Sequence, residues 1–348
     1  MRVTVNARNR GFEFEASPNE SLLLSGLRAG IALPYECATG TCGTCRATLL
    51  EGDINDPWPE APGRKLLKEA RDVLMCQCSP RSDCRVEVPG YAYHADASVR
   101  PPQQGRGVIR VASIIAPDIV SFEIETDVAF NFDAGQFVTL EAHGVQGPRA
   151  YSMVNYERGA KRLEFVIKRK PDGGFSEWLF GVPDLRVGAE VRIVGPFGKA
   201  TFHPALSSNI VCIAGGSGIA GMMAILQRAM HEGYFRQFRG DIFFGVRKSE
   251  DAFFLDQFDV AVEKFPNNLR VMIATSDEAP APALRDKYPR LQFAEGFVHQ
   301  VAVQSVGSKA ASAMTYLAGP PPLVDGALRA LIMEAKVRPD RIRYDKFN

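Results

Sequence analysis

Four cysteines near the start of the chain constrain its fold more than any other feature. Cys37, Cys42 and Cys45 follow the spacing C-x4-C-x2-C, and Cys76 comes after thirty intervening residues. This is the plant-type spacing with which four thiolates hold a [2Fe–2S] cluster. Small residues fill the loop between the first three cysteines, which lets backbone N–H groups approach the sulfurs. The N-terminal region therefore predicts a small domain built around a one-electron carrier.

Two alternatives to this ligand set stay open at the level of spacing. Zinc also takes four thiolates, but its structural sites usually pair two short knuckles, whereas here one knuckle is a triple and the fourth cysteine is distant. Cys78 lies two residues beyond Cys76, and spacing alone does not exclude it as the fourth ligand. We favour Cys76, because the apolar residues before it would bring its thiolate out of the core. Cys84 and Cys212 are interpreted as small buried hydrophobes.

Composition excludes several classes of function. The chain has 348 residues, enough for two or three domains, and a formal charge of +1 without long charged runs. Such a balance favours neither nucleic acid nor an anionic membrane. No apolar stretch approaches the roughly 18 residues of a membrane span, and the N-terminus begins as a strand rather than as a signal peptide. We therefore expect a cytoplasmic protein.

The pattern along the chain changes twice, which indicates three domains. Residues 1–92 alternate short strands with a helical stretch, and the polar, proline-containing segment 93–106 is typical of a linker. Short β-rich runs separated by glycines recur over 107–205 and predict an antiparallel barrel. Over 206–348, buried strands alternate with helices, which predicts a parallel sheet with helices on both faces. The expected fold class is multidomain, α+β and α/β.

A glycine-rich turn supplies the second strong motif. The stretch from Ala214 to Gly221 contains G-x-G-x-x-G directly after a predicted strand and at the start of a predicted helix. Glycines there let the backbone approach a pyrophosphate, whose charge then lies at the helix N-terminus. Arg247 and Lys248 follow the next strand and would suit the 2′-phosphate of NADPH, but the two acidic residues shortly after them would repel it. We expect NADH, with NADPH as the alternative coenzyme.

The middle region carries two motifs that suit a nucleotide with a flat ring. Arg149, Tyr151 and Ser152 end a predicted strand. Arginine pairs with phosphate, tyrosine stacks on rings, and serine can bond a ring nitrogen. Gly174 and Ser176 precede a helical stretch and repeat the combination of glycine, hydroxyl and helix N-terminus. Taken alone, such residues are more often a solvated barrel rim.

The order of the motifs resembles the NAD(P)H-dependent reductase components of bacterial multicomponent oxygenases, in which a plant-type ferredoxin precedes a ferredoxin–NADP reductase-like module. The likeness covers essentially the whole chain. It is carried by the cysteine cluster, Arg-x-Tyr-Ser, Gly-Gly-x-Ser, Gly-Gly-Ser-Gly-Ile, Gly319-Pro320-Pro321 and a C-terminal aromatic residue. The segment 49–63 and the closely spaced Cys76 and Cys78 are most similar to reductases of toluene and alkene monooxygenases.

The resemblance implies a β-grasp [2Fe–2S] ferredoxin domain, an antiparallel β-barrel FAD domain and a Rossmann-like NAD domain. It also implies that FAD accepts a hydride from NADH and that single electrons leave through the cluster. Ser152, facing flavin N5, and Asp345, near the proton path, are the catalytic candidates. The implied cofactor contacts come from Arg149, Tyr151, Ser152, Ile167, Lys168, Gly174, Ser176, Gly216, Ser217, Gly218, Gly319, Pro320 and Phe347.

Two positions depart from the family pattern. The family usually has a proline where this chain has Gly221, and a cysteine where it has Ala318. The first difference predicts a more flexible helix start, and the second removes a thiol from beside the transferred hydride. Hydride transfer needs no thiol nucleophile, so the expected function is unchanged.

The resemblance further implies a partner, either an oxygenase (hydroxylase) component or an intermediary ferredoxin. It would dock near the cluster loop, at residues such as Thr39, Thr41 and Thr44, and we expect the chain to be a monomer. Two other functions are to be tested: a redox-sensing regulatory module without turnover, and a flavin reductase whose cysteines hold zinc. The coenzyme motif weighs against a sensor, because a sensor needs no hydride donor.

Overall fold

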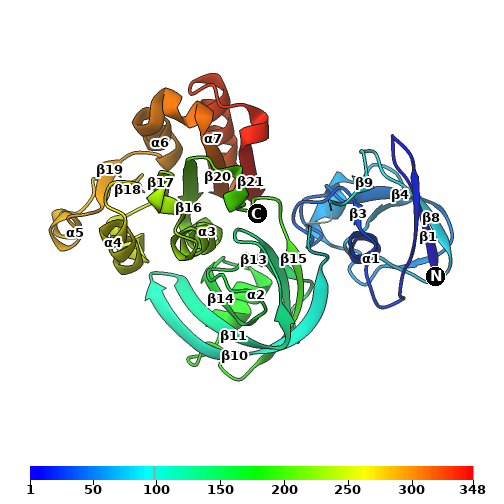
Figure 1. Ribbon diagram of the computed structural model, residues 1–348. Helices are drawn as coiled ribbons and strands as arrows, with labels where there is room; N and C mark the ends of the chain where they lie inside the picture. Colours follow the sequence, from blue (N-terminus) through cyan, green and yellow to red (C-terminus); the bar gives the residue numbers. More distant parts are fainter. Residues whose placement is uncertain (97–98, 348) are drawn as a thin grey trace.

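The computed structural model describes residues 1–96 and 99–347, and these residues form three domains around three main sheets (Figure 1). The first, the cluster domain, has a sheet of order β2-β1-β8-β4-β6. Helix α1 begins where Ser21 Oγ accepts the N–H of Leu24, and it buries its leucines against the sheet. The elements are β1 Arg2–Asn6, β2 Gly11–Glu15, α1 Leu22–Arg28, β3 Ile31–Ala32, β4 Arg46–Glu51, β5 Ile54–Asn55, η1 Pro62–Leu66, β6 Asp72–Leu74, β7 Ser79–Pro80, β8 Cys84–Glu87 and β9 Tyr93–His94.

The second, the barrel domain, is an antiparallel sheet of order β13-β12-β15-β10-β11-β14. Its end strands β13 and β14 contact each other, which closes the sheet. Phe175 and Leu179 of helix α2 are buried in the barrel core. The elements are β10 Gln103–Ala116, β11 Ile119–Phe130, β12 Phe137–Ala142, β13 Arg149–Ser152, β14 Ala160–Lys168, α2 Gly174–Phe180 and β15 Glu190–Phe197.

The segment 93–106, predicted as a linker, has strand pairing at both of its ends. Strand β9 at its start pairs with β3, and Gln103 to Arg106 at its end already pair with β15. Residues 97 and 98 of the predicted linker lie outside the described residues. Hydrogen bonds between strands therefore form at both ends of a stretch whose proline content had predicted irregular structure.

The third, the parallel-sheet domain, has the strand order β19-β18-β17-β16-β20-β21. Alternate residues of β16 point to opposite faces: Cys212 packs in the core with α3 and α4, whereas Ile213 packs with α6 and α7. The elements are η2 Pro204–Leu206, β16 Ile210–Gly215, η3 Gly216–Gly218, α3 Ile219–His231, η4 Tyr234–Arg236, β17 Gly240–Val246, η5 Ser249–Asp251, α4 Leu255–Lys264, β18 Leu269–Thr275, α5 Pro282–Lys287, β19 Gln292–Glu295, α6 Val298–Val306, η6 Gly307–Ser312, β20 Met314–Gly319, α7 Pro321–Met333, η7 Pro339–Arg341 and β21 Ile342–Lys346.

This strand order places the glycine-rich turn at a functionally important point. The sheet runs outward from β16 to β19 on one side and through β20 to β21 on the other. The turn after β16 therefore lies where the strand order reverses, which is where open parallel sheets bind nucleotides. The predicted fold class is confirmed.

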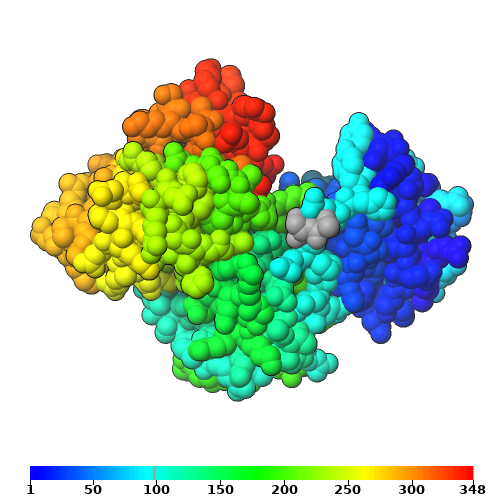
Figure 2. Space-filling model, in the orientation of Figure 1, coloured from blue at the N-terminus to red at the C-terminus, as the bar shows by residue number. Residues whose placement is uncertain are grey.

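The cluster domain forms a lobe beside the barrel, and the C-terminal strand β21 ends on the side that faces it (Figures 1 and 2). One hydrophobic core crosses the boundary, because Phe137 and Phe197 of the barrel belong to the buried cluster that fills the cluster domain. Among the described residues, no helix is both long and apolar enough to cross a membrane.

Candidate functional site

The four predicted cluster ligands lie as two pairs of thiols. Cys45 Sγ is 3.3 Å from Cys76 Sγ, and Cys37 and Cys42 interact with each other. Among the described residues, no three His, Cys, Asp or Glu side chains converge as ligands of one metal ion. Two thiolates at each of two irons is the arrangement that a Cys₄ [2Fe–2S] cluster requires. The paired donor set therefore fits the expected cluster.

The neighbours of Cys76 and Cys78 differ. Cys76 lies in the turn after β6, and its Sγ accepts a bond from the side-chain amide of Gln77 at 3.4 Å. Cys78 is buried, and its Sγ lies 3.9 Å from Arg64 Nη2. The backbone N–H of Thr39 donates to Cys37 Sγ at 3.4 Å, as the small residues of this loop had suggested. The geometry favours Cys76 as the fourth ligand.

Arg149 and Gly174 lie together at one end of the barrel. Arg149 Nη1 donates to the carbonyls of Gln146, Gly147 and Pro148 at 3.0–3.2 Å, which fixes the guanidinium. Its Nη2 lies 3.4 Å from the position that a Cβ on Gly174 would occupy. A glycine beside a fixed guanidinium leaves room for a phosphate, so the pair fits a pyrophosphate.

The other three candidates on the barrel, Ser176, Ile167 and Lys168, differ in their surroundings. Ser176 Oγ bonds within its own turn, to the Lys170 N–H and the Gly173 carbonyl. The side chain of Ile167 packs in the barrel core, so only its backbone is available to a nucleotide. Lys168 follows it at the end of β14 and is half-buried.

Ser152 connects the barrel to the glycine-rich turn. It is buried and pairs with Phe137 across β13 and β12. A Cβ on Gly221, at the start of α3, would lie 3.6 Å from Ser152 Oγ. The half-buried ring of Tyr151 lies 5.4 Å from that of Phe175, and burial raises the pKa of its phenol well above the usual value, so it stays neutral. The strand end that should meet a flavin thus adjoins the turn that should meet the coenzyme.

The glycine-rich turn packs closely against the neighbouring loop. A Cβ on Gly218 would lie 2.7 Å from the carbonyl oxygen of Ala318, so no larger residue fits there. Gly319 lies against Gly215, and Pro320 caps helix α7. Gly216, Ser217, Gly319 and Pro320 therefore share one edge of the parallel sheet.

The C-terminal residues reach the same region. The N–H of Phe347 donates to the Gly319 carbonyl at 3.0 Å, and its ring lies 6.5 Å from that of Phe137. Burial raises the pKa of Asp345 to about 7; a bond from the Lys199 backbone opposes this rise and the charge of Glu36 adds to it. A carboxyl group with a pKa near neutrality can give or take a proton.

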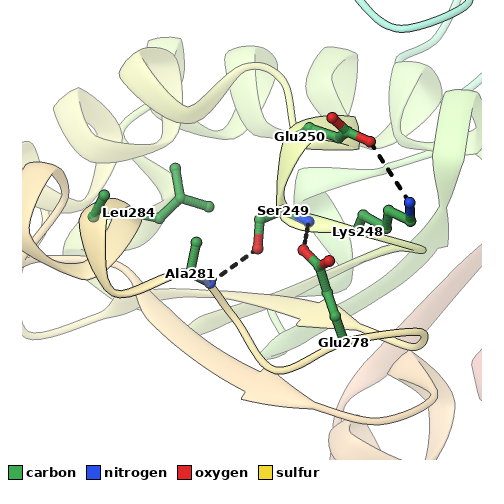
Figure 3. A pocket seen from close by; sticks show the side chains of 7 residues that line it. Lys248, Ser249, Glu250, Glu278, Ala281 and Leu284 are labelled. Atoms are coloured by element: carbon green, nitrogen blue, oxygen red, sulfur yellow. Dashed lines mark hydrogen bonds and ion pairs between the residues drawn. The ribbon is translucent and has the colours of Figure 1, made fainter.

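A cavity of about 500 Å³ opens beyond β17, where the adenosine of a dinucleotide is expected (Figure 3). Glu278 accepts the N–H of Ser249 at 2.8 Å, and Ser249 Oγ accepts the N–H of Ala281 at 2.9 Å. The nearby cations are paired, Arg247 with Asp251 at 3.6 Å and Lys248 with Glu250 at 3.9 Å. The sequence interpretation missed Glu278, because it comes from the loop after β18, far along the chain from Arg247.

Three family models match separate parts of the chain. Residues 4–81 match a 2Fe-2S iron-sulfur cluster binding domain, residues 107–202 an oxidoreductase FAD-binding domain, and residues 212–329 an oxidoreductase NAD-binding domain. These matches confirm the three predicted cofactor domains and their order.

Relatives of known function extend the likeness to the whole chain. The ferredoxin–NAD(P)(+) reductase CarAd of Metapseudomonas resinovorans is 34% identical over 94% of this chain and 94% of its own length. The ferredoxin–NAD(+) reductase component of an alkene monooxygenase system from Xanthobacter autotrophicus is 31% identical, over 97% and 99%. A solved ferredoxin reductase of carbazole 1,9a-dioxygenase has a TM-score of 0.81 and 33% identity, covering 100% of this chain and 99% of that one.

Proposed function

The chain belongs to the ferredoxin–NAD(P)⁺ reductases that serve as reductase components of oxygenase systems, and on this premise we propose that it carries electrons from NADH to the oxygenase component of an aromatic or alkene degradation system. Bound FAD would accept a hydride and release electrons singly to the cluster. The proposed domains are residues 1–92, 107–205 and 206–348.

The adjacency of Ser152 to Gly221 supports this proposal most directly. It brings the barrel strand that would face the flavin ring against the helix start that would hold the coenzyme. Arg149 and Gly174 would bind the FAD pyrophosphate, and Tyr151 would lie against the ring. Asp345 would hold a proton beside it, and Phe347 would cover it. Hydride transfer requires such close positioning of the two ring systems.

The adenosine cavity supports NADH as the coenzyme. Glu278 and Glu250 line it together with Lys248, and both Lys248 and the neighbouring Arg247 already have acidic partners. A 2′-phosphate would meet carboxylates there rather than a free arginine, whereas the unmodified ribose hydroxyl can donate to Glu278.

For the partner, we place docking at the exposed edge of the cluster loop. Thr39, expected at this surface, is buried, because its side chain bonds to that of Thr41 inside the loop. Thr41 and Thr44 are partly exposed. Leu66 on η1 is 55% exposed and lies against Gly43 of the loop. An apolar side chain beside the cluster suits a protein partner.

Two substitutions test this docking surface. Reversing the charge of Arg46, or Leu66→Ser, should slow electron delivery to the oxygenase without slowing flavin reduction.

We also infer that the protein acts as a monomer in the cytoplasm, since NADH is an intracellular coenzyme. Light scattering on the purified holoprotein tests the monomer.

Anaerobic stopped-flow mixing with NADH or NADPH tests the proposed function. We expect the flavin absorption to bleach first, the electron paramagnetic resonance signal of a reduced cluster to follow, and NADH to react faster. Absence of turnover with both cofactors loaded would favour the redox sensor. A colourless cysteine domain beside a yellow flavin would favour the zinc-holding flavin reductase.

A further inference from the structure

All three domains meet at one short segment, Phe197–Lys199, which begins at the last residue of strand β15 of the barrel. Tyr35 approaches it from the cluster domain, and Asp345 approaches it from the C-terminal strand β21. We call these residues the three-domain junction. The junction connects the proposed cluster site with the proposed flavin site. Tyr35 lies two residues before the cluster ligand Cys37, and Asp345 lies two residues before Phe347, which would cover the flavin.

Tyr35 makes three contacts with the segment. Its hydroxyl accepts the backbone N–H of Gly198 at 3.3 Å, its ring meets the Phe197 ring edge-on at 5.8 Å, and Lys199 Nζ lies 5.6 Å from the ring centre. The residue is thus held by its ring and by its polar end.

Gly198 is closely packed at the junction. Its φ is +100°, and a Cβ there would lie 3.0 Å from the Phe137 ring and 3.3 Å from Asp345 Oδ2. The Phe137 ring in turn contacts both Phe197, at 5.9 Å, and Phe347, at 6.5 Å. A displacement of Tyr35 would therefore shift the Phe197 ring and, through it, the Phe137 ring, which packs against Phe347 at the proposed flavin site.

A second contact between the same two domains lies on another loop. The Trp58 ring fills the space beside Gly147, where a Cβ would lie 2.1 Å from it, and Arg149 stands 5.4 Å above the ring. Trp58 is 8% exposed. A single contact would let the cluster domain pivot. Tyr35, Trp58 and the Gln104 side chain, which donates to Glu20 at 3.1 Å, hold it at several points instead.

We propose that Tyr35 is a positioning residue for electron transfer: by clamping the cluster loop to Phe197–Lys199, it fixes the cluster relative to the flavin. The inference rests on the proposed function. In the step concerned, one electron leaves the reduced flavin and one enters the oxidised cluster, with no atom transferred. Tyr35 would act through its contacts at the junction and would not itself carry the electron.

Hydrogen exchange and stopped-flow measurements on the complete holoprotein test this role, with the variants Tyr35→Phe and Tyr35→Ala. Tyr91→Phe and Tyr91→Ala are the matched controls, since Tyr91 is an exposed tyrosine of the same domain. In oxidised protein without NADH, Tyr35→Phe should speed exchange of peptides containing Gly198 by about fivefold, as expected for one lost hydrogen bond. Tyr35→Ala should speed it further.

After mixing with NADH, Tyr35→Ala should slow cluster reduction by about tenfold, the order of loss that a displaced reacting group causes, while flavin reduction stays unchanged. Unchanged exchange in both Tyr35 variants would overturn the clamp. Faster exchange with unchanged cluster reduction would overturn the positioning role. If wild-type protein failed to reduce its flavin with NADH, the proposed function would fall instead, and the exchange measurement would still report on the clamp.

Discussion

Cys76 and Cys78 are two residues apart, yet single substitutions should show which of them is the fourth cluster ligand. Cys76 Sγ lies 3.3 Å from Cys45 Sγ, whereas Cys78 Sγ faces Arg64. We predict that Cys76→Ser loses the cluster, so that bound iron falls well below the two atoms per chain of a [2Fe–2S] protein. Cys78→Ser should keep its iron. Iron analysis and the visible spectrum of purified protein check this, and the reverse result would make Cys78 the ligand.

Asp345 should make stability depend on pH. Burial raises its pKa from 3.8 to about 7, so between these values the folded chain keeps a proton that the unfolded chain releases. The free energy of unfolding therefore falls as pH rises from about 4 to about 7, and the loss is complete above that window. The side chain keeps some exposure, so a shift of this size gives an upper limit of about 4 kcal/mol.

Denaturant unfolding of the wild type and of Asp345→Asn at several pH values measures this effect. The difference between the two proteins isolates Asp345 from the other titrating groups. We expect the variant to gain stability relative to the wild type as pH rises through the window. A pH-independent difference would mean that the carboxyl group titrates normally.

At the scale of elements, the packing of the glycine-rich turn against β20 gives a sharp steric prediction. A Cβ on Gly218 would lie 2.7–2.9 Å from backbone atoms of Ala318 and Gly319, which cannot rotate away. Gly218→Ala should therefore cost about 1–3 kcal/mol of stability and weaken coenzyme binding. Gly90→Ala is the control, because its nearest atoms are 3.9 Å away. Thermal unfolding and NADH titration check both, and equal effects would contradict the packing argument.

The loop after β18 should select the coenzyme. Glu278→Gln removes a negative charge from the adenosine cavity, so the preference for NADH over NADPH should fall by about tenfold. Asp277→Asn removes a neighbouring charge that bonds to Ser276 rather than lining the cavity, and it should change the preference less. The ratio of kcat/KM values for the two coenzymes measures this. Binding of 2′,5′-ADP against 5′-AMP gives the same comparison without turnover.

Elements and their local motifs could be predicted from the sequence, whereas contacts between loops could not. Cysteine spacing and the glycine-rich turn are local patterns, and the structure assembles each within one or two elements. Glu278 reaches Ser249, and Tyr35 reaches Gly198, only after distant segments have packed. The start of strand β10 was hidden in the sequence for a related reason. Gln103 to Arg106 look irregular by composition, but the edge of β15 supplies their hydrogen-bond partners.

At the scale of the whole molecule, the proposed cofactor sites lie where domains meet. Ser152 of the barrel adjoins helix α3 of the parallel-sheet domain, and Arg149 adjoins Trp58 of the cluster domain. A ligand that binds such boundaries stabilises the folded arrangement of all the domains that it contacts. FAD should therefore act as a structural element of the complete chain.

This argument predicts how FAD and Arg149 together set stability. If FAD binds only the folded chain, FAD at 100 times its dissociation constant adds about 2.7 kcal/mol. Without FAD, Arg149→Ala should cost about 1–2 kcal/mol, because it loses its hydrogen bonds to the three loop carbonyls and its contact with the Trp58 ring. With FAD present, the cost should be larger, because the pyrophosphate loses its guanidinium partner. Thermal unfolding of FAD-depleted protein over a range of added FAD measures both quantities.

Arg162→Ala is the matched control for this prediction. Arg162 is an exposed arginine of the same barrel, paired with Glu123 at 2.8 Å on strand β11. Its loss should lower stability slightly and equally at every FAD concentration, because a surface ion pair contributes little and lies apart from the proposed site. If Arg149→Ala behaved like Arg162→Ala, Arg149 would hold the cluster domain through Trp58 and take no part in binding the pyrophosphate.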